Sequence, residues 1–106
     1  MASHPDFVDY VAQQLQQAGA IRSRKMFGEY GLYCDGVFFA VICDDQLFVK
    51  VTPQGEAAFP KLPKAPPYEG AKDYLWVEDV DDWDTMTALT RLTCQALREQ
   101  PKKRRK

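Results

Sequence analysis

The sequence predicts an α+β fold of two layers, in which helices cover a five-stranded antiparallel sheet in the order α-β-β-β-α-β-β-α. Residues 24–51 form the longest apolar stretch and contain two hairpin signals. Segments with helical spacing of apolar residues flank this stretch, near residues 4–18 and 82–99. The length of 106 residues and the 45% hydrophobic content suit one core, so we expect a domain over residues 1–100 and a basic tail at 101–106.

The first segment, residues 4–18, is predicted to be a helix. Pro5 suits its first position, Ser3 or His4 is placed to cap it, and Gly19 is placed to end it. Its apolar residues recur at helical spacing: Phe7, Val8, Val11, Leu15 and Ala18. This apolar face is expected to pack on the sheet.

The first strand is expected between residues 21 and 34, where Gly28 and Gly31 interrupt the pattern as a bulge or bend. Asp35-Gly36 then predicts a two-residue hairpin turn, because both central positions of a type I′ turn need positive φ. A second strand is predicted to follow this turn and to run to residue 43.

The third strand, residues 46–51, is predicted to follow a second two-residue turn at positions 44–45. That turn length aligns three apolar pairs, which would form one face: Ile42 with Leu47, Ala40 with Val49, and Phe38 with Val51. The face so defined is expected to meet the helices. If the first turn also has two residues, Gly31 and Tyr33 join it.

The opposite face of the same hairpin is predicted to be apolar as well: Val37, Phe39, Val41 and Phe48. Burying such a side chain is worth about 1.5–3 kcal/mol, so leaving all four in water is unfavourable. We therefore expect a second copy of the chain, a further helix or a ligand to cover them, and a homodimer is one expected form.

The second half of the chain predicts shorter elements. A short helix is expected after Thr52, and four prolines between residues 60 and 67 predict an extended connection. Strands are predicted at Tyr68, on a sheet edge, and at residues 74–77. The five acids within residues 78–84 are expected to serve the first turn of the last helix rather than a bound cation.

Catalytic and metal-binding patterns are weak. The chain has one histidine, His4, and three cysteines without CxxC spacing, so neither a catalytic triad nor a zinc site can be assembled. Cys43 and Cys94 are expected to be buried, and Cys34, beside a turn, to be partly exposed. We expect no enzyme activity, no cofactor and no metal.

Charge is distributed unevenly along the chain. Five of the 14 basic residues form the tail, which leaves nine basic against 15 acidic residues elsewhere. The N-terminus lacks the basic start of a signal peptide, and no apolar run approaches the roughly 20 residues that cross a bilayer. We expect a cytoplasmic protein that does not enter the membrane.

Two basic segments give an alternative function, direct nucleic-acid binding. The first segment is a cluster on the first strand: Arg22, Arg24 and Lys25. The second segment is the tail: Lys102, Lys103, Arg104, Arg105 and Lys106. A further alternative is a small-ligand pocket built from four tyrosines: Tyr30, Tyr33, Tyr68 and Tyr74.

The central stretch resembles the N-terminal domain of the TfoX/Sxy family of bacterial competence regulators. Several short motifs carry the resemblance: a basic pair followed by Met26-Phe27-Gly28, then Tyr30-Gly31-Leu32-Tyr33, Asp35-Gly36, Asp44-Asp45 and Leu47-Phe48-Val49-Lys50. Pro67-Tyr68, the predicted strand at residues 74–77 and the acid-led last helix are similar too. The resemblance extends from about residue 6 to residue 99.

The resemblance implies a five-stranded antiparallel sheet with helices, similar to secretion chaperones, and a link to transcriptional activation of DNA-uptake genes. The full-length regulators act with the cyclic-AMP receptor protein and carry a second, C-terminal helical domain that is not within these 106 residues. We therefore expect a non-enzymatic regulatory module that binds a protein partner, with the transcription machinery as the expected class.

Ten residues are candidates for the interaction surface: Arg22, Arg24, Lys25, Met26, Phe27, Tyr30, Val37, Phe39, Val41 and Phe48. Four others are expected to set the backbone geometry of the hairpins: Gly28, Gly31, Asp35 and Gly36.

Overall fold

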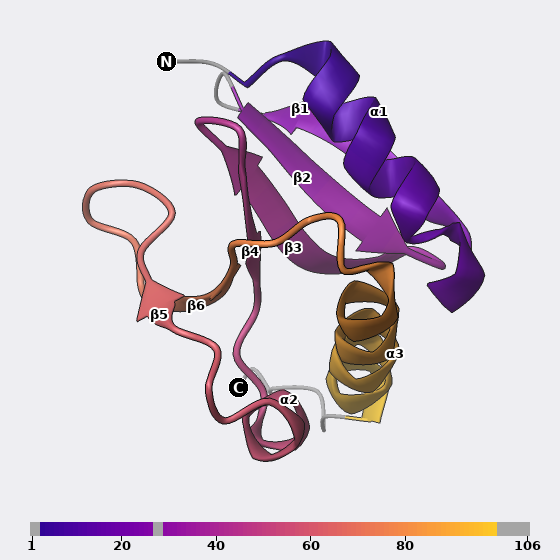
Figure 1. The fold of residues 1–106 in the computed structure, drawn as a ribbon, viewed down its shortest axis with the longest axis vertical. Coiled ribbons are helices and arrows are strands. Elements are labelled where there is room, and N and C mark those ends of the chain that lie inside the picture. Colours follow the sequence, from indigo (N-terminus) through magenta and orange to yellow (C-terminus); the bar gives the residue numbers. More distant parts are fainter. Residues whose placement is uncertain (1–2, 27–28, 100–106) are drawn as a thin grey trace, which may run out of the picture.

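The computed structural model describes residues 3–26 and 29–99, which form a two-layer α+β fold (Figure 1). The elements follow in this order: α1 (Pro5–Gln14), the 3₁₀ turn η1 (Gln16–Ala18), β1 (Ile21–Met26), β2 (Glu29–Cys34), β3 (Val37–Cys43), β4 (Gln46–Val49), α2 (Pro53–Ala58), β5 (Lys64–Ala65), β6 (Tyr74–Val77) and α3 (Trp83–Glu99). One sheet of order β1-β2-β3-β4-β6-β5 contains six strands, and every neighbouring pair is antiparallel. The predicted fold class is confirmed, with six strands in place of five.

The additional strand comes from the region predicted to be one interrupted strand. β1 and β2 pair antiparallel with Met26 opposite Glu29, so the chain reverses direction between these two residues. Gly28 lies outside the described residues. Gly31 is not a bulge, because it pairs with Arg24 on one side and Val41 on the other.

The edge strand also differs from its predicted position. β5 is the pair Lys64–Ala65, and Tyr68 lies outside the sheet with 62% of its surface exposed. Pro66 and Pro67 follow β5 directly. Neither proline has an amide hydrogen to donate to the ladder, so β5 ends after two residues.

The start of α1 and the glycine that follows η1 differ in how well the sequence predicted them. α1 is shorter than predicted, and Pro5 does take its first position. Neither Ser3 nor His4 caps it through a side chain, since both are engaged with Asp45 instead. A Cβ on Gly19 would lie 2.7 Å from the Cys34 sulfur, so only glycine allows this approach.

The later helices follow their predicted caps. The Thr52 hydroxyl accepts a 3.0 Å hydrogen bond from the Gly55 amide and starts α2. The Asp82 carboxylate accepts from the Thr85 amide at 3.2 Å, so the acidic segment does cap α3. α2 then packs against α3, where a Cβ on Gly55 would lie 3.2 Å from Leu89.

The main core lies between the helices and one face of the sheet. α1 and α3 lie on the same side of the sheet in Figure 1. Helix residues such as Val11 and Leu89 are fully buried against strand residues such as Leu32, Ile42 and Leu47. This amphipathic packing is what the helical spacing predicted.

Two type I′ hairpin turns fix the middle of the sheet. Asp35 and Gly36 have φ of 50° and 85°, as the Asp-Gly pair predicted, and the second turn has φ of 54° and 56°. The predicted partners Ile42–Leu47 and Ala40–Val49 are confirmed. The third predicted pair does not form, because β4 ends at Val49.

A β-bulge at Phe39 changes which residues reach the core. β2 residues Leu32 and Tyr33 pair with Ala40 and Phe38, so Phe39 has no partner of its own. Phe39 is fully buried in the main core, and Phe38 is only partly buried on the other face. The predicted placement of Phe39 opposite the core is therefore wrong, as is the placement of Tyr33 and Gly31 toward it.

The bulge gives a direct test of this register. Phe39→Ala removes a fully buried ring and is expected to lower the free energy of unfolding by about 3–5 kcal/mol. Phe38→Ala removes a partly exposed ring and is expected to cost about 1–2 kcal/mol. Urea denaturation of both variants measures the difference, and a larger loss from Phe38→Ala would exclude the bulged register.

Candidate binding face of the sheet

The face of the sheet turned away from α1 and α3 is the most distinctive surface of the described residues. We call it the open face, because no helix contributes to its apolar cluster. That cluster contains strand residues only: Val41, Cys43 and Phe48, with Phe38, Ala65, Tyr74 and Trp76 packed against them. The strand ladder sorts the residues of the open face into two rows that cross the sheet.

The first row begins at Arg22 and crosses to the middle of the sheet. Arg22 pairs with Tyr33, and Tyr33 pairs with Phe38. The rings of Tyr33 and Phe38 lie 5.3 Å apart at an interplanar angle of 39°. The Lys50 ammonium stands 4.6 Å above the Phe38 ring, a cation–π contact that joins β4 to the row.

The second row begins at Arg24. Arg24 pairs with Gly31, which pairs with Val41, and the row continues through Phe48 to Trp76. Phe48 and Trp76 are stacked, with their centroids 6.3 Å apart and their planes inclined by 19°. Both rows therefore place a guanidinium at the β1 edge and paired aromatic rings farther in.

Side chains of the same sheet bury much of this apolar face. Val41 is 7% exposed and Phe48 is 3% exposed, and Phe39 lies in the main core. Val37, the first residue of β3, is partly exposed and pairs with Cys34 of the main core, so its predicted placement on the open face is wrong, as it was for Phe39. Three of the four apolar side chains that predicted a covering chain, helix or ligand are therefore buried within one chain.

The predicted basic cluster is divided between the two faces. Arg22 and Arg24 belong to the open face, and Lys25 pairs with Tyr30, which packs against the helix-side core. All three cations are exposed. Alternation along β1 accounts for the division, since neighbouring strand residues point to opposite faces.

The carboxylates lie outside both rows. Glu29 alternates with the helix-side Tyr30 and is the acid of β2 on the open-face side, where it accepts hydrogen bonds from the Ser3 and Asp44 amides and adds to the raised pKa of Cys43. Neither row contains a carboxylate among the residues of the strand ladder. The hydroxyl of Tyr10 on α1 donates to Asp81, which puts this acid of the segment before α3 on the helix side. Within residues 3–26 and 29–99 the ion pairs are His4–Asp45, Lys64–Glu56 and Arg98–Asp35, and none includes a cation of the open face.

Lys50 is the cation most embedded in the open face. Burial lowers the pKa of its ammonium, and the nearby positive charge of Lys72 lowers it further. Its ammonium is the charged group in contact with the aromatic part of the open face, where it stands over the Phe38 ring.

Several predicted residues lie outside this description. Met26 ends β1, and Phe27, Gly28 and the basic tail at 102–106 are not among the described residues. Their predicted roles in binding stay predictions.

The thiols do not form a nucleophilic site. All three are buried, which corrects the expectation that Cys34 is partly exposed. Burial raises the pKa of Cys34, that of Cys43 to about 11 and that of Cys94 to about 12. Such thiols stay protonated at neutral pH and are poor nucleophiles. In the described part of the chain, no three His, Cys, Asp or Glu side chains are grouped as metal ligands.

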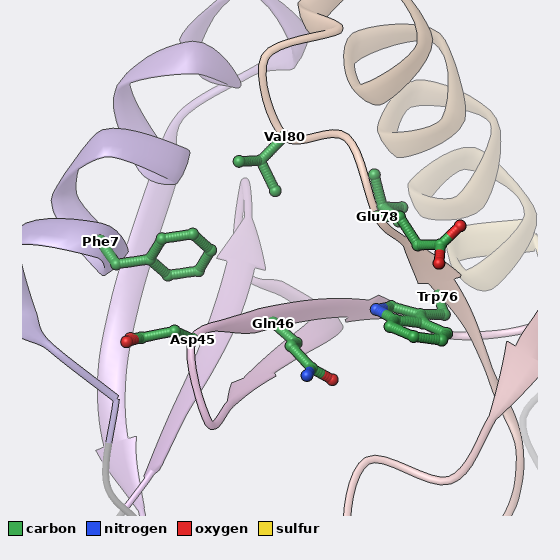
Figure 2. A pocket seen from close by; sticks show the side chains of 7 residues that line it. Phe7, Asp45, Gln46, Trp76, Glu78 and Val80 are labelled. Carbon is green, nitrogen blue, oxygen red and sulfur yellow. The ribbon is translucent and has the colours of Figure 1, made fainter.

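A cleft of about 300 Å³ lies at the other end of β4 (Figure 2). Phe7 reaches it from α1, Val80 from the connection to α3, Asp45 from the turn before β4, and Gln46 from the start of β4. Trp76 and Glu78 complete its polar lining, and none of the four tyrosines predicted to form a pocket lines it. Asp45 is already engaged by His4 at 2.6 Å.

The four tyrosines are not brought together as a pocket. Tyr30 packs on the helix side, Tyr33 and Tyr74 lie on the open face, and Tyr68 is exposed outside the sheet. The ring-bearing residues that sequence reasoning missed are Phe38 and Trp76, together with the cation Lys50. Alternation along residues 74–77 could have predicted that Trp76 lies on the open face. The bulge that turns Phe38 to that face could not be predicted, because every residue of β3 is apolar.

No helix among the described residues has the length and apolar character needed to cross a membrane.

Comparison with known proteins gives two matches. A family model described as "TfoX N-terminal domain" matches residues 13–99. An "Uncharacterized 12.7 kDa protein in trpE 5'region" of Spirochaeta aurantia is 36% identical over 99 residues, which cover 92% of this chain and 85% of that protein. Both matches include the strands of the open face.

The buried thiols predict how stability depends on pH. An unfolded thiol ionises near its ordinary pKa of 9, whereas Cys43 and Cys94 stay protonated in the folded chain up to about 11 and 12. Their contribution to the free energy of unfolding is therefore complete below pH 9 and is lost as pH rises through this range. Urea denaturation between pH 8 and 11 should show the decline, and Cys94→Ala should make it shallower. An unchanged slope in that variant would contradict the assignment.

Proposed function

The chain belongs to the TfoX N-terminal domain family, and from this premise we propose that it is a non-enzymatic regulatory module that acts by binding through its open face. At the level of the family this is a competence-related regulatory domain. The observation that carries the proposal is the open face itself: two rows of aromatic side chains, each with a guanidinium at one end and no carboxylate within the row.

Two findings support binding over catalysis. The buried thiols with raised pKa values are unsuited to nucleophilic attack, and His4 is engaged with Asp45 at the surface. In contrast, partly exposed aromatic rings and arginines are the residue types that carry most binding energy at interfaces. The chemistry of this surface suits recognition.

The proposed setting is transcriptional control of DNA-uptake genes in the bacterial cytoplasm, with the transcription machinery as the partner. The family supports this setting, because the resemblance connects these domains with competence regulators. A protein partner is one occupant of the open face. Nucleic acid is a second candidate, favoured by the alignment of Arg22, Arg24 and Lys50 on one side of the sheet.

A complementation experiment tests this function. The gene is deleted in its host, and transcripts are compared after return of the wild-type chain, of Arg22→Glu/Arg24→Glu, or of Lys25→Glu. We expect the double reversal to leave the DNA-uptake transcripts at least about tenfold below wild type, because reversing two charges at an interface costs more than the 1.4 kcal/mol that a tenfold change in affinity represents.

Lys25→Glu is the matched control, since it reverses a neighbouring exposed charge on the other face of the same strand. It should restore transcription. Full restoration by the double variant, with circular dichroism showing both proteins folded, would refute a regulatory role for the open face.

A further inference from the structure

We propose that the open face binds single-stranded nucleic acid, with unpaired bases stacked on Tyr33 and Trp76 and phosphates held by Arg22, Arg24 and Lys50. The inference rests on the proposed function, because it names the occupant of the same face. Three observations carry it: the placement of the rings, the placement of the cations, and the absence of helix residues from the apolar cluster of this face.

The rings are held ready for stacking. Tyr33 packs beside Phe38 and Trp76 is stacked on Phe48, so neither ring has to be ordered when a base arrives. Tyr33 and Trp76 are each partly exposed, while Phe48 beneath is 3% exposed and serves as support. Stacking on an aromatic side chain is tolerant of base identity, since every base has a π face.

The rings lie at a spacing that one strand of nucleic acid can span. Tyr33 is on β2 and Trp76 on β6, with β3 and β4 between them. Neighbouring strands lie about 4.8 Å apart, which separates the two positions by roughly 14 Å across the strands, and the step from one row to the next adds about 7 Å along them. This distance suits a few extended nucleotides that cross the strands.

The cations are placed to meet phosphates on both sides of the rings. Arg22 and Arg24 stand at the β1 edge, and Lys50 stands over Phe38 on the other side of Tyr33. A polyanion fits this arrangement better than an isolated carboxylate, because the cations are distributed along both rows. Asp81 of the acidic segment is bonded to Tyr10 on the helix side, whereas Glu78 lines the same cleft as Trp76, so a strand that stacks on Trp76 passes one carboxylate there.

The geometry favours a single strand over a duplex. A duplex is read by a helix or ribbon that enters a groove, whereas the apolar cluster of the open face is built from strand residues and contains no helix residue. Bases of a duplex are stacked on one another, so their faces are closed to Tyr33 and Trp76. An unpaired strand exposes them.

The test uses the full chain and three labelled ligands of about 12 units each: oligothymidylate, an abasic strand with the same phosphates, and a duplex of the same length. Fluorescence anisotropy should give a Kd for oligothymidylate at least about tenfold below that for the abasic strand, because stacking is worth roughly 1–3 kcal/mol per base. The basic tail attracts all three polyanions, so this difference isolates the contribution of the bases.

Variants locate the site on the open face. Tyr33→Leu should weaken binding of oligothymidylate about tenfold and leave the abasic strand unaffected, while Tyr33→Phe, which keeps the ring, should bind like wild type. Arg24→Gln should reduce the salt slope of log K by about 0.7, the value for one phosphate contact to a single strand. Lys25→Gln, its neighbour on the other face, should leave the slope unchanged.

Tryptophan fluorescence gives a second measurement. Trp83→Phe leaves Trp76 as the sole tryptophan, and stacking of a base should quench its emission on titration with oligothymidylate but not with the abasic strand.

Two results would overturn the inference: equal affinity for oligothymidylate and the abasic strand, or equal effects of Arg24→Gln and Lys25→Gln. If either occurs while the Arg22→Glu/Arg24→Glu protein still fails to restore transcription, the face binds a protein and the proposed function stands. If nucleic acid binds as expected but the double reversal restores transcription, the binding site stands and the proposed function fails.

Discussion

The fold depends on the unpaired residue in β3. The extra residue at Phe39 lets two neighbouring phenylalanines serve opposite faces of one sheet: Phe39 completes the core under the helices, and Phe38 joins Tyr33 outside. A regular strand would place Phe39 outside and turn Phe38 inward. The core would then lose its largest buried side chain, and Lys50 would lose the ring beneath its ammonium. The bulge thus links stability and surface chemistry at one position.

The same arrangement separates the charges of an acidic chain. The acids before α3 are used where they are favourable, at a helix start and beside Tyr10, and the turn acid Asp45 holds the N-terminal residues Ser3 and His4. The two rows of the open face carry cations, apolar side chains and aromatic rings, while Glu29 of β2 lies beyond them near Cys43. The net charge of the chain therefore does not predict which ligands the open face attracts. At contact distance, attraction depends on the charges of that face more than on the total charge of the chain.

Local chemistry was predictable where one or two residues determine the backbone. The Asp35-Gly36 turn, the Thr52 cap and the pairing of Ile42 with Leu47 all follow from sequence. The strand count did not, because the reversal between Met26 and Glu29 resembles an interruption in a single strand. The open face was predicted only in part: alternation gives Arg22 and Arg24, but seven consecutive apolar residues in β3 hide the bulge. The rows also depend on pairing between distant strands, which no local pattern contains.

The two edges of the sheet are β1 and β5, and their compositions bear on how the chain behaves at high concentration. β5 ends at Pro66 and Pro67, which cannot donate hydrogen bonds to an incoming strand. β1 carries cations on both of its faces, so a second copy that tried to extend the sheet at that edge would meet like charge. Arg22 and Arg24 thus oppose the pairing of this edge strand with another copy of the chain. This role does not depend on any ligand. Neutralising both would be expected to expose a route to edge-to-edge aggregation.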